Sequence, residues 1–557
     1  MTISETAPIA RPAALEERTM CDALRVTIAG NRERVALRSP DDAVSLTFAD
    51  LAPTLAATAS ILHEMGLRRG DALGLMLRNR VEFHVVDAAA MLLGATPFSL
   101  YLTSPAEQIA FVMGDAGNPL VVTEPMFEEV VHAAAGDAVR VVGLDELAGG
   151  DPGFDLDAHA DAVTPDDLLT LIYTSGTTGP PKGVEITHAN MLAELRGMHA
   201  AVPLEGGGRQ VSFLPAAHIA DRWTSHYSAF MTYANTLTPV PDAGRLMPVL
   251  AQVRPTVFGS VPRVWEKIRA ALEAAAGPQL ADAARADPAV GAAIRAKLGF
   301  DQVQWLCCGA APAPVELLEF FDALGLPICE VWGMSETSCI VTTNRPARTR
   351  FGSVGLPVDG MDLRIAEDGE LLVRGPLVMA GYRGRDDLTA EAIDADGWLH
   401  TGDVARIDAD GYVWIVDRKK ELIINAAGKN MSPQNIEGAI KVACPMVLSS
   451  VAIGDDRPYI TALLTLDPDA CAAYAAKAGL ADGTPEALSA DAGVQGLVQA
   501  GIDDANSKLA RVEQIKKFTI LPTPWMPGGD ELTPTMKLKR KVIAEKYAAE
   551  IEGLYNA

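Results

Sequence analysis

The chain has 557 residues, which is too long for one ordinary hydrophobic core and predicts about three to four structural units. Apolar residues make up 49% of it and charged residues 21%, a balance that excludes a disordered or fibrous chain and is typical of globular enzymes. The net charge of −25 would repel the phosphates of DNA or RNA, and no basic stretch interleaved with aromatic residues offsets it, so we exclude nucleic acid as an expected partner.

Cysteine spacing and the N-terminal sequence indicate the compartment. The seven cysteines show no CxxC pair, so we expect reduced and mostly buried thiols. The first 20 residues lack a basic start followed by an apolar core, and no run of eighteen apolar residues occurs anywhere in the chain. The sequence therefore predicts a cytoplasmic protein with neither a signal peptide nor a transmembrane segment.

Helix-like and strand-like segments alternate from the N-terminus to about residue 165. The segments 46–66 and 81–95 have the apolar spacing of helices, whereas 71–77 and 119–124 are short apolar runs typical of buried strands. Strands that alternate with helices imply a parallel sheet. We therefore expect an α/β fold in this part of the chain.

A loop rich in glycine and hydroxyl groups follows, with the sequence YTSGTTGPPKGV from Tyr173 to Val184. An apolar run precedes it, and the segment 185–195 has helical spacing, which predicts a strand, a loop and a helix. Glycines let backbone N–H groups approach an anion, the hydroxyls add donors, and Lys182 supplies positive charge, so the loop is suited to phosphate. It is not a P-loop, because Gly183 stands where that motif needs Ser or Thr. A surface loop without a ligand is the alternative.

The rest of the chain continues the alternation and then changes character. Strands are predicted at 209–215, 256–262 and 303–310, a helix at 261–277 and an alanine-rich helical insertion at 278–299. From about 350 to 416, Asp-Gly turns between short alternating segments predict antiparallel hairpins in a small β-barrel-like unit. Helices and strands then return, which predicts an N-terminal domain over 1–416 and an α+β C-terminal domain over 417–557.

Six motifs in a fixed order carry a resemblance that spans nearly the whole chain. They are YTSGTTGPPKGV, GAAP at 309–312, VWGMSET at 331–337, WLHTGD at 398–403, DRKKELIINAAGKNMSPQNIE from Asp417, and LTPTMKLKRK from Leu532. In these motifs the chain resembles the adenylate-forming enzymes, the superfamily of acyl-CoA synthetases, firefly luciferase and the adenylation domains of peptide synthetases. The last two motifs look most like those of long-chain fatty acyl-CoA synthetases. The resemblance implies layered α/β subdomains followed by a smaller, mobile C-terminal domain.

The resemblance also implies a reaction in two steps. The carboxylate of a medium- to long-chain fatty acid is expected to attack ATP, which gives acyl-AMP and pyrophosphate. The thiol of coenzyme A then displaces AMP, after the C-terminal domain has rotated. Mg²⁺ would accompany ATP. Three alternatives stay open at this point: an enzyme that passes the acyl group to a carrier protein, a luciferase-type oxygenase, and a non-catalytic nucleotide-binding protein.

For the first step, the resemblance assigns Lys537 as the catalytic lysine, which meets the carboxylate and the α-phosphate. Met536 precedes it where the family usually has glycine. His218 matches a histidine near the acyl carboxylate, and Glu336 matches a ligand of Mg²⁺, a cation that prefers oxygen. The basic run MKLKRK that contains Lys537 could instead be a solvated surface or touch anionic lipid.

The remaining ATP and AMP contacts fall into four groups by resemblance. The β- and γ-phosphates would meet Thr174, Ser175, Gly176, Thr177, Thr178 and Lys182. The adenine region would be formed by Gly309, Ala310, Ala311 and Trp332, with Trp332 as a stacking face where the family usually has Tyr, and Glu330 and Gly333 would also belong to the ATP/AMP site. Hydroxyls near the α-phosphate would come from Ser335 and Thr337. The ribose would meet Asp403 and Arg418, and the nucleotide would also meet Asn430.

For the second step, the family's hinge aligns with Lys420, and Asp417 is the alternative. Gly428 would line the path of coenzyme A. Arg222 and Trp223 are expected to line the entrance of the tunnel that takes the acyl chain.

Overall fold

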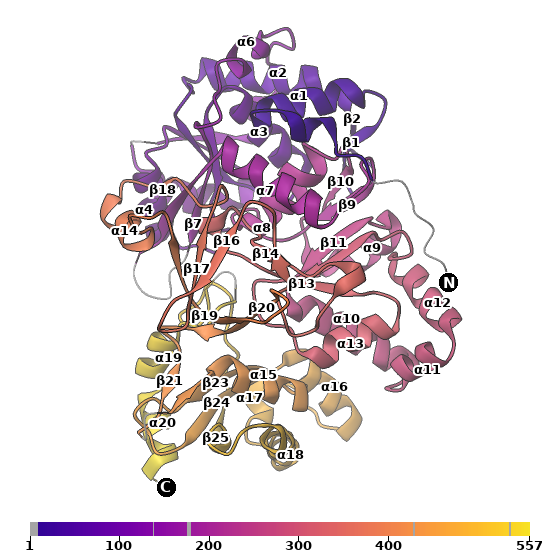
Figure 1. The fold of residues 1–557 in the computed structure, drawn as a ribbon, viewed down its shortest axis with the longest axis vertical. Helices are drawn as coiled ribbons and strands as arrows, with labels where there is room; N and C mark the ends of the chain where they lie inside the picture. The colour runs from indigo at the N-terminus through magenta and orange to yellow at the C-terminus, as the bar shows by residue number, and fades with distance from the viewer. Residues whose placement is uncertain (1–8, 138, 175–179, 427–428, 534–535, 557) are drawn as a thin grey trace.

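The structure is a computed structural model that describes residues 9–137, 139–174, 180–426, 429–533 and 536–556 (Figure 1). Within these ranges no helix is both long and apolar enough to cross a bilayer. All seven cysteines are described, and each is buried and free, in agreement with the sequence prediction.

A four-stranded parallel sheet in the order β4-β3-β5-β6 organises the first part of the chain. Its strands are β3 (Ala72–Met76), β4 (Thr96–Ser99), β5 (Leu120–Thr123) and β6 (Arg140–Gly143). The accompanying helices are α1 (Met20–Gly30), α2 (Phe48–Glu64), α3 (Val81–Leu92), α4 (Ala106–Ala116), α5 (Glu128–Ala135) and α6 (Leu156–Ala160). This arrangement confirms the predicted alternation.

Two further sheets complete the central part. One has the order β2-β1-β10-β9, with β1 (Val35–Arg38), β2 (Ser45–Thr47), β9 (Arg209–Ser212) and β10 (Thr236–Pro239). The other has the order β11-β12-β13-β14-β15, with β11 (Val257–Ser260), β12 (Trp305–Cys308), β13 (Ile328–Trp332), β14 (Thr342–Thr343) and β15 (Leu356–Pro357). The helices around them are α8 (Ile219–Asp221), the π-helix η4 (Arg222–Phe230), α9 (Leu246–Val253), α10 (Pro262–Ala276), α11 (Leu280–Ala286), α12 (Pro288–Leu298) and α13 (Val315–Ala323).

The segment after the glycine-rich loop is a strand, which corrects the predicted order of strand, loop and helix. The loop joins β7 (Leu168–Thr174) to β8 (Lys182–Thr187) as an antiparallel hairpin, in which Thr174 pairs with Lys182. The helix α7 (His188–Ala201) begins only where the Thr187 hydroxyl accepts the Asn190 N–H as an N-cap. Ser175, Gly176, Thr177 and Thr178 lie outside the described residues.

The hairpins predicted between 350 and 416 are present, but they form an open sheet. Its order is β16-β17-β19-β20, so β16 and β20 are edges, and the predicted barrel-like closure is not among the described pairings. The strands are β16 (Asp362–Ile365), β17 (Glu370–Arg374), β19 (Leu399–Ile407) and β20 (Val413–Arg418). Nearby, β18 (Gly381–Tyr382) pairs with β8, and α14 (Asp386–Ala392) follows it.

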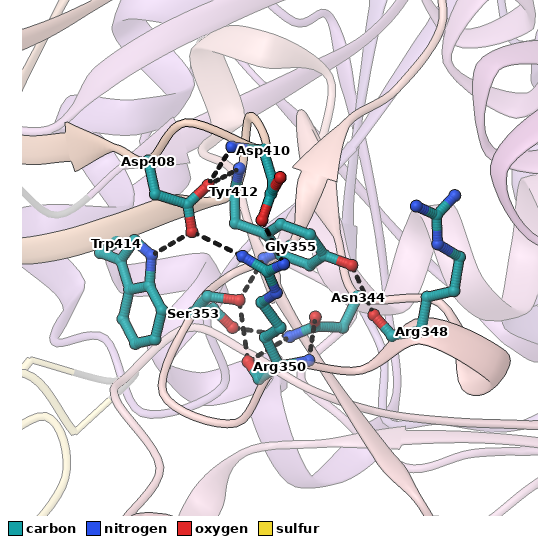
Figure 2. A network of polar contacts seen from close by, with 9 residues as sticks. All are labelled: Asn344, Arg348, Arg350, Ser353, Gly355, Asp408, Asp410, Tyr412 and Trp414. Atoms are coloured by element: carbon teal, nitrogen blue, oxygen red, sulfur yellow. Dashed lines mark hydrogen bonds and ion pairs between the residues drawn. The ribbon is translucent and has the colours of Figure 1, made fainter.

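A polar network fastens the loop 344–355 to the hairpin of β19 and β20 (Figure 2). Arg350 forms ion pairs with Asp408 at 2.9 Å and with Asp410 at 2.5 Å, and its guanidinium lies 4.1 Å from the centre of the Tyr412 ring. The Tyr412 hydroxyl donates to the Arg348 carbonyl at 2.8 Å. The network thereby fixes the loop that follows β14.

The C-terminal part, drawn in orange to yellow at the lower end of Figure 1, has hydrophobic clusters of its own. Its strands are β21 (Ile423–Ile424), β22 (Asn430–Met431), β23 (Val447–Ile453), β24 (Ile460–Leu466) and β25 (Ile515–Leu521). Its helices are α15 (Pro433–Ala443), α16 (Pro468–Ala478), α17 (Pro485–Leu488), α18 (Ala492–Lys508), α19 (Arg540–Lys546) and α20 (Ala548–Asn556). Both of these clusters contain only residues from Ile423 onward. The domain boundary at 417 stays a prediction.

Candidate active site

Three of the predicted nucleotide-binding residues are in contact with one another: Trp332 at the end of β13, Asp403 in the middle of β19 and Arg418 at the end of β20. Asp403 and Arg418 are cross-strand neighbours, and the Arg418 Nε lies 2.8 Å from the Asp403 Oδ1. The Trp332 indole N–H donates to the Asp403 Oδ2 at 2.8 Å. Burial raises the pKa of Asp403 above its ordinary value, against the opposing charge of Arg418. Each carboxylate oxygen is thus held in place while it retains a second lone pair for a ligand hydroxyl.

Glu330, on β13, binds protein backbone. Its Oε2 accepts the Gly352 N–H at 2.7 Å, and burial raises its pKa to about 8. Because Gly352 belongs to the loop held by the Arg350 network, Glu330 ties that loop to β13. The structure thus gives Glu330 a supporting place beside Trp332, and a direct nucleotide contact remains a prediction.

The turn after β13 explains why glycine stands at position 333 and what Thr337 does. A Cβ atom on Gly333 would lie 1.6 Å from the Cys339 carbonyl oxygen, so only glycine fits. The Thr337 hydroxyl donates to the Met334 carbonyl at 3.0 Å and accepts the Met334 N–H at 3.1 Å. Thr337 is fully buried in the turn η6 (Ser335–Thr337), where its hydroxyl stabilises the turn, and its place near the α-phosphate stays a prediction. Ser335 stays a candidate for that place.

Glu336 and Lys182 are linked through a tyrosine that the sequence reasoning missed. The Tyr382 hydroxyl donates to the Glu336 Oε1 at 2.9 Å, and the Lys182 Nζ lies 4.7 Å from the centre of the Tyr382 ring. Tyr382 reaches both because β18 pairs with β8, opposite Val184. Only an isolated aromatic residue between glycines marks this position in the sequence, which is a weak signal.

The loop GAAP follows β12 and is partly to fully exposed at its first three residues. A Cβ atom on Gly309 would lie 2.7 Å from a Val331 methyl group, which explains its glycine. Ala310 has a φ of +65°, in the left-handed region that costs a non-glycine residue about 1–2 kcal/mol. Gly309, Ala310 and Ala311 therefore form a tight, open loop beside Trp332, as a slot for a flat ring requires.

His218 is neutral and keeps one N–H free to donate. It is the N-cap of α8, where its Nδ1 accepts the Ala220 N–H at 3.1 Å, so the proton of the neutral ring is on Nε2. Burial, and secondly the charge of Lys537, lowers the pKa of His218 to about 4. This places the histidine within electrostatic reach of the predicted catalytic lysine.

The lowered pKa makes a prediction about pH. The pKa of His218 is lowered from its ordinary value of 6.5 to about 4, so the ring is neutral near pH 6.5. We therefore expect that the rate of fatty-acid activation shows no change near pH 6.5 that comes from His218. Activation should be measured from about pH 5 to pH 9 in the wild type and in His218→Gln, which keeps a neutral donor that does not titrate. The two profiles should have the same shape. A wild-type midpoint near 6.5 that disappears in His218→Gln would contradict the neutral assignment.

Lys537 reaches this site from the C-terminal part. Burial and the charge of Arg418 lower its pKa, while Asp403 and Glu336 oppose the shift. The residue remains exposed, so its loss of hydration is only partial. Met536 before it has a φ of +64°, which explains why glycine is usual at that position. The predicted lysine therefore interacts electrostatically with Glu336 and Asp403, the residues predicted to bind the metal and the ribose.

The other basic residues of MKLKRK have separate partners. The Lys539 Nζ donates to the Gly529 carbonyl at 2.9 Å, and Arg540 forms ion pairs with Glu421 at 3.1 Å and Glu437 at 2.6 Å. Lys541 is exposed. This division speaks against a continuous basic surface for lipid.

The two predicted hinge residues differ in environment. Lys420 is exposed in the turn after β20, whereas Asp417 is fully buried and accepts the Ser432 hydroxyl and the Gln434 N–H, the latter at 3.2 Å. A pivot is more easily placed at the exposed residue. Asn430 lies on β22, and Gly428 lies outside the described residues.

Arg222 does not line an entrance, which corrects that prediction. Its side chain is fully buried at the start of η4, with the guanidinium 2.6 Å from Asp87 and 3.0 Å from the Tyr227 hydroxyl. Trp223 is buried as well; its N–H donates to Glu194, and its ring lines an interior cavity of about 20 Å³ together with Trp305. Trp223 thus lines an internal wall rather than a mouth.

The chain is similar to known proteins over most of its length. The family described as AMP-binding enzyme matches residues 24–383, and that described as AMP-binding enzyme C-terminal domain matches 420–557. The chain is 52% identical, over 435 residues, to the putative fatty-acid–CoA ligase fadD11 of Mycobacterium tuberculosis, and the alignment covers 72% of this chain and 76% of the relative. It is 36% identical over 557 residues to the long-chain-fatty-acid–CoA ligase FadD15 of the same species, with 92% of each chain covered.

The fold is similar to that of O-succinylbenzoate coenzyme A synthetase from Bacillus subtilis, solved in complex with ATP and a magnesium ion. The TM-score is 0.73 at 23% identity, and the match covers 93% of this chain and 98% of that one. The likeness confirms the predicted fold class of layered α/β units with a smaller C-terminal part.

Proposed function

The chain belongs to the AMP-binding enzyme family, and from this membership we infer the reaction that its site supports. It is an AMP-forming fatty acid–CoA ligase. In the first step a carboxylate oxygen attacks the α-phosphorus of ATP, and the bond to pyrophosphate breaks to leave acyl-AMP. In the second step a thiol sulfur attacks the acyl carbon, and AMP leaves. The relatives favour this activity over the carrier-loading, oxygenase and non-catalytic alternatives.

The residues present fit ATP with Mg²⁺. The described residues contain no group of three metal-ligating side chains, and Glu336 stands as a single carboxylate oriented by Tyr382. Mg²⁺ is usually held by one or two carboxylates together with substrate phosphates, which is the donor set that Glu336 and a nucleotide would provide. When bound there, it would neutralise phosphate charge. Lys182 would add its charge to the β- and γ-phosphates from β8.

One observation carries the proposed mechanism of the first step: Lys537, from the C-terminal domain, interacts electrostatically with Asp403, Glu336 and His218 of the N-terminal domain. Attack by a carboxylate concentrates negative charge at phosphorus, and a positioned cation stabilises it. We assign that role to Lys537. The neutral His218 would donate its Nε2–H to the fatty-acid carboxylate, and Asp403 would accept the ribose hydroxyls while Trp332 and Arg418 hold it.

For the second step we propose that the C-terminal domain rotates about Lys420 and withdraws Lys537. The exposed position of Lys420, in the turn after β20, suits a pivot. Coenzyme A is the proposed thiol substrate, with Gly428 on its path and Asn430 at the nucleotide. We further propose a medium- to long-chain fatty acid as substrate and a cytoplasmic location, which the free buried cysteines support.

The proposal is tested by measuring pyrophosphate release from ATP with and without fatty acids and coenzyme A, across fatty, aromatic and polycyclic acids. We expect pyrophosphate release to require a fatty acid, and acyl-CoA to form only when coenzyme A is added. Release of phosphate without any acid would point to a hydrolase. Accumulation of acyl-AMP that coenzyme A does not consume would favour a carrier protein as the acceptor.

A further inference from the structure

A contact between the two domains, far from the reacting groups, joins the start of α10 to the start of α16. The Arg263 guanidinium binds the Asp467 Oδ2, and one turn further along α10 the Lys267 Nζ lies 3.3 Å from Asp469. The side chains of Arg263 and Asp467 are 30% and 7% exposed, whereas those of Lys267 and Asp469 are 61% and 84% exposed. Solvent screening makes the outer pair worth little, so the inner pair dominates the contact.

Both oxygens of the Asp467 carboxylate have partners at this contact. Its Oδ1 accepts the N–H groups of Asp469 and Ala470, each at 3.0 Å, and so caps α16, while its Oδ2 is left for Arg263. Arg263 itself lies in the first turn of α10, which has no acidic residue and where the helix dipole disfavours a cation. Two carboxylates offset this cost: Glu266 on the same helix, 3.3 Å from the guanidinium, and the more deeply buried Asp467 of the other domain.

Each residue is rigidly connected to its own domain. Trp265 and Ile268 anchor α10 in an N-terminal cluster. Asp467 directly follows β24. Leu463 of β24 belongs to a hydrophobic cluster of the C-terminal domain, and Leu538, the neighbour of Lys537, packs against that cluster. Asp467 and Lys537 therefore move together with β24. A rotation that withdraws Lys537 must also part Asp467 from Arg263.

We propose that Arg263 and Asp467 are positioning residues for fatty-acid activation: their contact holds the C-terminal domain in the orientation that presents Lys537 to the site. A contact made in only one of two orientations shifts their populations by its own free energy. The inference rests on the proposed two-step function with domain rotation. In this inference the pair sets the balance between the two half-reactions and does not contact a substrate.

Asp467→Asn is the sharpest test, because asparagine caps a helix as well as aspartate and removes only the charge. We expect a roughly fivefold loss in the rate of fatty-acid-dependent exchange between ATP and pyrophosphate, the size of a pair worth about 1 kcal/mol. The reaction of supplied acyl-AMP with coenzyme A should keep its rate or become faster. Arg263→Met should act alike, and the double variant should be no worse than either single one.

The matched control is Asp491→Asn, which makes the same change at the N-cap of α18. The Asp491 carboxylate accepts hydrogen bonds from the Val494 N–H and the Tyr474 hydroxyl, and both of these described partners lie in the C-terminal domain. This control should leave both half-reactions unchanged. Equal losses in both half-reactions of Asp467→Asn, or no loss in either, would overturn the proposal.

A measurement of orientation separates failure of this inference from failure of the proposed function. Dyes on Ala283→Cys and Glu486→Cys, two exposed positions on opposite sides of the contact, report the domain orientation by energy transfer, since the native thiols are buried. Asp467→Asn should change the transfer in the ligand-free protein, and Asp491→Asn should not. No change, or a change without slower exchange, would overturn the inference. A wild type without any exchange would instead refute the proposed function.

Discussion

Replacing Lys537 with alanine is expected to lower the rate of acyl-AMP formation roughly 100- to 1,000-fold, which is the usual effect of removing a group that stabilises charge in a transition state. The reason is electrostatic: the charges of Asp403 and Glu336 act on Lys537 of the C-terminal domain, and the charge of Lys537 acts on His218. The reaction of supplied acyl-AMP with coenzyme A should be largely spared, because the lysine is withdrawn in the proposed second orientation. Single-turnover rates of the two half-reactions measure the difference.

Lys541→Ala provides the control for this experiment. Lys541 belongs to the same basic run, is exposed, and has Glu545 as its ion-pair partner at 4.0 Å. We expect both half-reactions to keep their rates in this variant. If Lys537→Ala slowed both half-reactions equally, the lysine would stabilise the fold or bind substrates, and it would not act by stabilising the negative charge of the first step.

Replacing Arg222 with methionine is expected to lower the free energy of unfolding by about 3–5 kcal/mol, the usual cost of removing one partner of a buried ion pair. Asp87 and Arg222 are both fully buried, and His226 is the second partner of Asp87 at 2.9 Å. Burial raises the pKa of Asp87, but Arg222 and His226 outweigh this effect and hold that pKa below its ordinary value. Without Arg222 a charged or newly protonated carboxyl would remain in the interior. Urea unfolding followed by tryptophan fluorescence measures the loss.

Two further variants decide between a structural role and the acyl entrance that the sequence predicted for Arg222. Asp87→Leu combined with Arg222→Met should recover much of the lost stability, because an apolar pair can replace a buried ion pair. Arg285→Met removes an exposed pair with Asp282 and should leave the unfolding midpoint unchanged. Unchanged stability in Arg222→Met, with an altered preference for acyl chain length, would restore the entrance prediction.

Local patterns were sufficient for most of the secondary structure. The apolar runs that became β3 and β5, and the helical spacing that became α2 and α3, are periodic features of neighbouring residues, so a single sequence contains them. The strand β8 was missed because the helical spacing of 185–195 overlaps its end, and only pairing with β7 across the loop identifies Lys182–Thr187 as a strand. The barrel-like closure failed for the same reason, since strand order is not a local property.

The sequence by itself determined the chemistry of this protein, because six ordered motifs specify which residue types stand at which positions, among them Lys537, Glu336 and Asp403. The tertiary structure decided which of these side chains meet and which are buried. Tyr382 reaches Glu336, Trp332 holds Asp403, and Arg222 lies in the interior, in each case across a long separation in the chain. Such contacts depend on how sheets and domains pack, and burial follows from that packing, whereas periodicity records only which face of one element is apolar.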